Sequence, residues 1–116
     1  MELLMMELNR GDIVVVNFNP TKGNEMGKLR PAIILSNDED NEILDTVIVI
    51  PLSTVIEPNT MPYRVHIKSR EKLKKDSDAC IYEVRALSKI RVKEKLAKIN
   101  KKELTLIQNC LCEIIK

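Results

Sequence analysis

The sequence predicts a mainly β fold: a small β-barrel that ends in an amphipathic C-terminal helix. Several short runs are rich in Val and Ile and are separated by Gly, Pro, Asn and Asp, a pattern typical of strands joined by turns. Only the last segment changes to apolar side chains three or four residues apart, the spacing of a helix. With 116 residues, the chain is long enough for one domain with one modest core.

Residues 13–18 and 31–35 are the first two predicted strands, and a long polar loop joins them. Gly and Pro residues keep either strand from continuing through this loop. The loop is longer than a tight hairpin needs, and long ordered loops are usually functional or mobile. Arg30 stands where the loop ends, and Pro31 restricts its backbone to extended conformations. We therefore expect the Arg30 guanidinium to project from a stiff base.

The sequence of the middle region predicts one central strand and several weaker elements. Residues 38–42 are predicted to be a solvated acidic turn, and the almost wholly apolar residues 46–52 a central strand buried on both faces. The remaining predictions are a loop at 57–60, a strand at 63–68, a charged loop at 69–78, a strand at 79–87, a turn at 88–91 and a weaker strand at 92–99.

The strand at 63–68 alternates cleanly between apolar and cationic side chains. Tyr63, Val65 and Ile67 are predicted to face the core, and Arg64, His66 and Lys68 to face outward. This pattern predicts a half-buried strand with a cationic outer face.

A helix over residues 101–115 is predicted at the C-terminus. Asn100 followed by Glu103 fits the start of a capping box. One face carries Leu104, Ile107, Leu111 and Ile114, and it is widened by Leu106, Cys110 and Ile115. This apolar face of the helix is wider than packing against one small barrel would bury.

Residues 1–8 are expected to be an N-terminal extension to a single domain over residues 9–116. The extension is apolar but has no cationic region, so a signal peptide is not predicted. It is either frayed or a short oligomer contact. No apolar run approaches the roughly 18 residues that a membrane span needs.

The charge balance excludes a strongly basic, non-specific nucleic-acid binder. Lys and Arg number 19 against 17 Asp and Glu, so any positive surface for RNA must be local. The chain has an odd number of cysteines, so they cannot all pair in disulfides within it, and the spacing of Cys80, Cys110 and Cys112 is not that of metal ligands. They are predicted to be structural thiols in a reducing cytoplasm.

The first third of the chain carries a long motif of mixed composition. It runs through Arg10-Gly11-Asp12, Asn19-Pro20-Thr21, Gly23, Glu25, Gly27 and Arg30-Pro31, and then an apolar run that ends in Ser36-Asn37. This order resembles the MazF/PemK (Kid) toxin family of bacterial toxin–antitoxin pairs. The resemblance continues more loosely to the C-terminus.

The resemblance implies an SH3-like β-barrel of the CcdB/PemK type with helices, working as a cytoplasmic homodimer. It implies a sequence-specific endoribonuclease that cleaves single-stranded mRNA by attack of the 2′-OH. The products would be a 2′,3′-cyclic phosphate (or 3′-phosphate) end and a 5′-OH end. No metal or other cofactor is implied, and the expected protein partner is a MazE-like antitoxin.

Four catalytic candidates follow from the resemblance. Arg30 matches the arginine of the family's Arg-Pro pair, and a guanidinium suits the negative charge of a phosphorane transition state. The family's catalytic threonine falls on Ser53, with Thr54 beside it, so either hydroxyl is a candidate. Glu25 matches an acidic position associated with activity, as a base for the 2′-OH or as a contact to an RNA base.

The RNA-binding candidates lie in two segments. Lys28 is in the loop that leads to Arg30. Tyr82, Glu83 and Arg85 match the segment where the family carries an acid, a glutamine and a basic residue, so Tyr82 and Glu83 depart from the pattern. A carboxylate only accepts hydrogen bonds, whereas an amide also donates, so the recognised RNA base differs or activity is reduced. His66 matches no catalytic position and is expected to be solvated or to graze the RNA.

Two alternatives to a nuclease stay open at the level of sequence. CcdB toxins share this fold but act by binding DNA gyrase, so the chain is alternatively a non-catalytic inhibitor of a protein target. The departures at Ser53, Tyr82 and Glu83 also fit a decayed relative that is retained as a binding module.

Overall fold

The computed structural model describes residues 6–19 and 28–116. The strands within these ranges are β1 (Asp12–Asn17), β2 (Leu29–Ile34), β3 (Thr46–Ser53), β4 (Arg64–Ile67), β5 (Ser77–Cys80), β6 (Arg85–Ser88) and β7 (Val92–Lys98). The helices are α1 (Asp38–Ile43) and α2 (Lys101–Ile115), with short 3-10 turns at η2 (Ile81–Glu83) and η3 (Lys89–Arg91). The predicted strands at 13–18, 31–35, 46–52 and 92–99 and the helix at 101–115 are confirmed.

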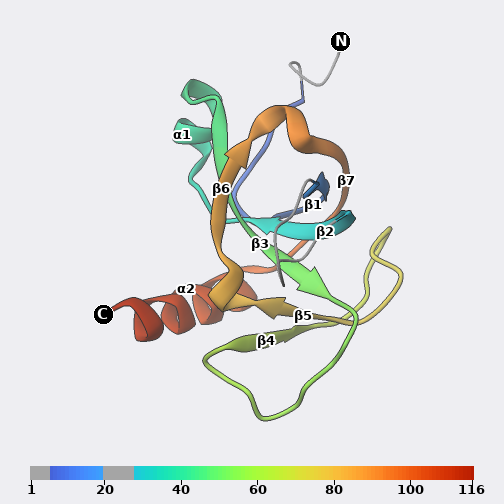
Figure 1. Ribbon diagram of the computed structural model, residues 1–116, viewed down its shortest axis with the longest axis vertical. Helices are drawn as coiled ribbons and strands as arrows, with labels where there is room; N and C mark the ends of the chain where they lie inside the picture. Colours follow the sequence, from blue (N-terminus) through green and yellow to red (C-terminus); the bar gives the residue numbers. More distant parts are fainter. Residues whose placement is uncertain (1–5, 20–27) are drawn as a thin grey trace.

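All the strand pairs are antiparallel, and β3 is the hub of the sheet. The strand order is β4-β5-β3-β2-β1-β7, and β6 pairs with the first half of β3 (Figure 1). Among the described residues no ladder joins β6 to β7, so the curled sheet stays open there. The predicted class, a mainly β fold with a C-terminal helix, is confirmed, but among the described residues the sheet does not close into the predicted barrel.

Two apolar clusters lie on opposite sides of β1, β2 and β3, because side chains alternate along each strand. One cluster lies beneath α2 and includes Ile33, Ile50, Leu52, Ile67, Ile81, Ile107 and Cys110. The other fills the curled part of the sheet and includes Val14, Val16, Phe18, Ala32, Ile34, Val49 and Leu87. The prediction that β3 is buried on both faces is wrong for its first half, where Ile48 is exposed.

Residues 38–43 form the helix α1, so the predicted turn is wrong, whereas its acidic side chains are exposed as predicted. Asn37 caps the helix by accepting a hydrogen bond at Oδ1 from Asp40 N, at 2.7 Å. The acidic residues of the first turn lie at the positive end of the helix dipole. At the other end, Lys89 Nζ donates to the carbonyl oxygen of Asn41. Contacts from distant segments thus hold a helix that is too short to be stable alone.

The predicted strand at 79–87 is two strands with a turn between them. β5 pairs with the last residues of β3, through Leu52 opposite Ala79 and Ser53 opposite Asp78. The chain then turns through η2, and β6 continues along the same edge of β3. The sheet curls at this point, so one straight strand does not follow β3 along its whole length.

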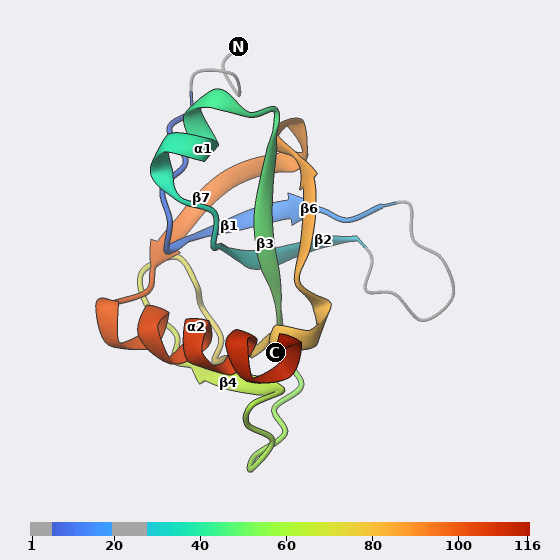
Figure 2. The same ribbon diagram turned by 90° about the vertical axis from the view of Figure 1, so that its left-hand side faces the viewer.

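Helix α2 packs across β4 at the opposite end of the molecule from α1 (Figure 2). Asn100 and Glu103 form the predicted capping box, each side chain accepting from the other's backbone N–H at 2.8 Å. Both carboxylate oxygens of Glu103 also accept from the Arg70 guanidinium, at 2.6 Å each. The start of α2 is therefore fixed to the loop before β5.

Part of the predicted N-terminal extension can be placed. Leu8 is buried in the second cluster, and its carbonyl oxygen accepts from Asn41 Nδ2 at 3.1 Å. Residues 1–5 and 20–27, the latter including Glu25, lie outside the described residues. No helix within 6–19 and 28–116 is long and apolar enough to cross a membrane.

Candidate active site

Two strand ends meet at one end of the sheet. β2 begins there and the antiparallel β3 ends beside it, while β6 begins opposite Val49, four residues before Ser53. Ala32 pairs with Pro51, so Arg30 and Ser53 lie two residues further along their strands toward this end. Strand alternation turns both side chains to the face occupied by the second cluster. The two principal catalytic candidates therefore lie on adjacent strands and share a face.

Arg85 brings a second guanidinium to this end. It pairs with Val49 across β3 and β6, and its guanidinium carbon lies 5.6 Å from the centre of the Phe18 ring. That distance allows a cation–π contact, which orients the cation without neutralising it. Arg30 is half-buried and Arg85 is exposed. The local positive charge that RNA binding requires is present here although the net charge is only +2.

Ser53 and Thr54 differ in their surroundings. Ser53 is 6% exposed, and its Oγ accepts a hydrogen bond from Val55 N at 3.1 Å. Thr54 follows the end of β3 and is exposed. Of the two hydroxyls that the sequence left open, the one on Ser53 lies in a defined hydrogen-bonded position on the Arg30 face.

Tyr82 and Glu83 lie in η2, which leads directly into β6. Both side chains are exposed, and the Tyr82 ring meets the Tyr63 ring edge to face at 5.9 Å between centroids. The prediction that Tyr63 faces the core is wrong, because the residue precedes β4 in a turn and is 55% exposed. Two exposed tyrosine rings therefore lie together here, and an aromatic ring can stack on an unpaired RNA base.

Cys80 connects these groups electrostatically. Burial raises the pKa of its thiol, and the guanidinium charges of Arg64 and Arg30 oppose that rise, while Glu83 adds to it. The charges of Arg30 and Arg64 thus act on this thiol in one direction and the charge of Glu83 in the other.

Lys28 closes the described end of the loop before β2. Its N–H donates to Asn19 Oδ1 at 2.9 Å, and its carbonyl oxygen accepts from Phe18 N at 3.0 Å. The residue has a φ of 66° and an exposed side chain. Lys28 is thus held at the mouth of the site with its ammonium free to meet solvent or phosphate.

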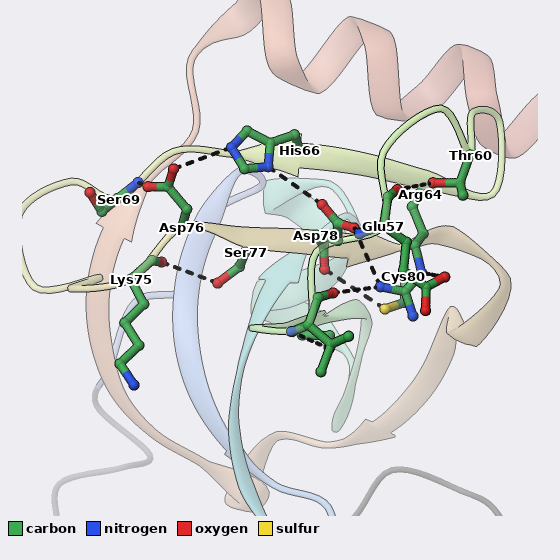
Figure 3. Close-up of polar contacts among 12 residues, drawn as sticks. Glu57, Thr60, Arg64, His66, Ser69, Lys75, Asp76, Ser77, Asp78 and Cys80 are labelled. Carbon is green, nitrogen blue, oxygen red and sulfur yellow. Dashed lines mark hydrogen bonds and ion pairs between the residues drawn. The ribbon is translucent and has the colours of Figure 1, made fainter.

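β4 alternates as predicted, with Val65 and Ile67 buried, but carboxylates accompany the cationic residues on its outer face. Arg64 lies 3.4 Å from Asp78 Oδ2, and the two ring nitrogens of His66 face Asp78 at 3.5 Å and Asp76 at 3.3 Å (Figure 3). A backbone N–H of Ser69 holds the pKa of Asp76 below its usual range, with a smaller effect of His66. The carboxylates come from β5 and the turn before it, across the sheet.

Asp78 is the site residue that the sequence analysis missed. It was assigned to the end of a charged loop, but it is a β5 residue only 2% exposed. The only sequence signal that Asp78 is buried in a strand is that it immediately precedes the apolar run that begins at Ala79. Among residues 6–19 and 28–116, no group of three or more His, Cys, Asp and Glu side chains is arranged to hold a metal ion.

Comparisons with known proteins agree on one family. The model of the "PemK-like, MazF-like toxin of type II toxin-antitoxin system" matches residues 9–115. The endoribonuclease MazF of Staphylococcus saprophyticus is 36% identical over 105 residues, which cover 90% of this chain and 88% of the relative.

Solved structures share the fold at lower identity. MazF from Deinococcus radiodurans superposes with a TM-score of 0.80 at 22% identity, covering 95% of this chain and 97% of that one. A MazE-MazF structure from the same organism gives 0.76 at 21% identity, covering 95% and 96%.

Proposed function

Because this chain belongs to the PemK-like, MazF-like toxin family of type II toxin–antitoxin systems, we propose that it is an endoribonuclease that cleaves mRNA. The observation that carries the proposal is the placement of Arg30 and the Ser53 hydroxyl on adjacent strand ends and on one face. The alternative of a non-catalytic, CcdB-like inhibitor is not favoured, because the curated relative is named an endoribonuclease.

In the proposed reaction the ribose 2′-OH attacks the adjacent phosphorus atom, and the P–O5′ bond breaks. The new P–O2′ bond gives a 2′,3′-cyclic phosphate, and the leaving oxygen takes a proton to become a 5′-OH. The pentacoordinate transition state carries extra negative charge on its oxygen atoms. Arg30 stabilises this charge, because a guanidinium donates two parallel hydrogen bonds and stays protonated. Ser53 donates its O–H to a non-bridging oxygen and so positions the scissile phosphate.

RNA binds across the mouth of this site in the proposal. Lys28 and Arg85 contact phosphates, and Tyr82 stacks on an unpaired base beside Glu83, whose carboxylate accepts from a base edge. Glu25 remains the candidate for the base that takes the 2′-OH proton. The reaction uses no metal, and the substrate places the protein in the cytoplasm.

The proposed assembly is a homodimer that binds a MazE-like antitoxin. One copy leaves apolar side chains exposed beside α2, among them Met61 at 60%, Leu106 at 39% and Ile115 at 67%. A two-fold dimer buries this surface. The antitoxin's acidic segment occupies the cationic mouth near Arg30 and Arg85. Sedimentation equilibrium tests the dimer, and a concentration-independent mass near 13.3 kDa contradicts it.

The test of the function is cleavage of a long single-stranded RNA by the purified protein in excess EDTA. We expect cuts at one short sequence, and sequencing of the ends identifies it. A phosphatase that does not open cyclic phosphates, with and without prior acid treatment, identifies the 2′,3′-cyclic ends. Intact RNA, or cleavage that needs added Mg²⁺ or Mn²⁺, contradicts the proposal.

A further inference from the structure

Asp78 buries a carboxylate directly across from Ser53. The two residues are paired in the β3–β5 register, and Asp78 is 2% exposed. A buried charge is costly unless it is paired and hydrogen-bonded. Here Oδ2 accepts from Glu57 N at 2.8 Å and lies 3.4 Å from Arg64 Nη1, while Oδ1 faces His66 Nδ1 at 3.5 Å (Figure 3). Both oxygens of the carboxylate therefore have partners.

Arg64 extends this arrangement to the segment that follows β3. Its Nη1 donates to the carbonyl oxygen of Val55 at 2.9 Å, and its Nε lies 3.6 Å from Glu57 Oε1. The segment is thus held at two points, at Val55 through Arg64 and at the Glu57 backbone by Asp78 itself. Nη1 alone contacts both Asp78 Oδ2 and the Val55 carbonyl oxygen, and the ammonium of a lysine in place of Arg64 ends one bond short of that nitrogen.

Val55 completes the connection to the candidate catalytic hydroxyl. Its carbonyl oxygen is held by Arg64, and its N–H donates to Ser53 Oγ at 3.1 Å. A serine hydroxyl has one hydrogen to donate and two lone pairs that accept. Because Val55 N–H uses one lone pair, the Ser53 hydrogen turns away from Val55 and toward other acceptors.

We propose that Asp78 and Arg64 are positioning residues for RNA cleavage, which fix Val55 and thereby aim the Ser53 hydroxyl at the scissile phosphate. The inference rests on the proposed function, in which Ser53 donates to a phosphate oxygen. Neither residue touches the reacting atoms in this account. Their effect on the rate passes through Ser53, so it disappears when the Ser53 hydroxyl is absent.

The test is a double-mutant cycle on single-turnover cleavage of one RNA oligonucleotide that contains the mapped cut site. Arg64→Met keeps an unbranched side chain and removes the guanidinium that contacts Asp78 and Val55. We expect it to slow cleavage on the order of tenfold in the wild-type background, because small displacements of a positioned group are costly to the rate. In the Ser53→Ala background the same change should cause no further loss. RNA affinity should not change in either background.

Two further variants keep the test decisive if Arg64→Met unfolds the protein. Arg64→Lys retains a cation on this side of Asp78, so the protein should fold. Its ammonium ends one bond short of the Nη1 position that holds the Val55 carbonyl oxygen, so cleavage should be slower than in the wild type. Asp78→Asn keeps an acceptor for Glu57 N–H but removes the negative charge that attracts Arg64. Like Arg64→Lys, it should fold and cleave RNA more slowly than the wild type. Asp12→Asn, in a buried aspartate far from Ser53, is the matched control and should leave the rate unchanged.

The outcomes separate this inference from the proposed function. The inference is overturned if the Arg64 substitutions lower the cleavage rate equally with and without the Ser53 hydroxyl. It is also overturned if folded Arg64→Lys and Asp78→Asn both cleave at the wild-type rate. If the wild-type protein cleaves RNA and Arg30→Ala does not, either result leaves the nuclease function standing. Failure of the wild-type protein to cleave removes the proposed function instead.

Discussion

The two ends of the β1–β2–β3 sheet each bury an aspartate, and they hold it in different ways. Asp12, where β1 begins, accepts from Asn9 N at 2.9 Å and lies 3.4 Å and 3.0 Å from the ammonium groups of Lys95 and Lys98. Both lysines extend into solvent. Asp78, at the Ser53 end, is held by a backbone N–H, a half-buried guanidinium and an imidazole.

The difference lies in what each partner holds besides the carboxylate. The lysines beside Asp12 end in water, so this group fixes only the local turn at residues 9–12. Arg64 also holds Val55 and thereby the surroundings of Ser53. We therefore expect substitutions at the Ser53 end to change the cleavage rate and those at the Asp12 end to change only stability.

The largest effect expected at the Ser53 end is that of Arg30→Ala. Losing one preorganised charged contact to the transition state typically costs on the order of 10² to 10³ in rate. Arg30→Lys should recover little, because an ammonium does not span two phosphate oxygens. Single-turnover rates and RNA affinity measured together should show rate falling more than affinity. Near wild-type cleavage by Arg30→Ala sinks the assignment.

Ser53→Ala comes next and chooses between the two neighbouring hydroxyls. Removing a hydrogen bond to a charged phosphate oxygen, worth about 1.5–3 kcal/mol, slows the reaction by a factor on the order of 10 to 10². Thr54→Ala, the matched change at an exposed position, should slow cleavage less. If Thr54→Ala instead slowed cleavage more than Ser53→Ala, the catalytic hydroxyl would be that of Thr54. The role proposed for Val55 in orienting Ser53 would then no longer hold.

At the other end of the sheet, Asp12→Ala should lower the melting temperature without changing the rate. The change leaves Asn9 N–H without its acceptor, which costs about 1–3 kcal/mol. For a domain of this size, each kcal/mol lowers the melting temperature by roughly 4 °C. Calorimetry and a cleavage assay at a temperature where the variant is folded check both parts. A slower rate in the folded variant would break the comparison between the two ends.

The smallest effect concerns Arg70→Met, also at the Asp12 end, where Arg70 donates to the Lys98 carbonyl oxygen. The Arg70 hydrogen bonds are the main reason that the pKa of Glu103 is lowered. A carboxyl with a lowered folded-state pKa stabilises the protein above its unfolded pKa and loses this contribution as pH falls through the folded value. The wild type should therefore exceed the variant by about 0.5–1 kcal/mol near pH 7. The gap should close below about pH 4.5, as denaturant melts at several pH values can show.

The sequence predicted those parts of the fold where one local rule acts alone. β3 is an almost unbroken apolar run, α2 has a strong helical periodicity, and Asn100 with Glu103 specifies where α2 begins. Helix α1 was missed because its acidic residues resemble a loop, although Asn37 followed by three acidic residues carried the signal of a helix start.

The site was predictable only where a family motif covered it. Arg30 came from the motif and Ser53 from the looser family resemblance that continues beyond it, and their placement on adjacent strands follows from the β2–β3 register. Asp78 was not predictable, because its role depends on Arg64 and Glu57, both distant in sequence, being brought across the sheet. The curl of the sheet at η2, which splits the predicted strand at 79–87, likewise depends on tertiary pairing with β3.

Glu103 also sets the direction in which α2 opens. Its carboxylate is shared by the Asn100 N–H and the Arg70 guanidinium, and the next turn buries Ile107. The last turn has an exposed Ile115 and no comparable anchor among the described residues. We therefore expect local unfolding to start at the C-terminal end and to move toward Glu103, so amide hydrogen exchange should be fastest near residue 115 and become slower toward the first turn. The part of α2 that covers the core is the last to leave it.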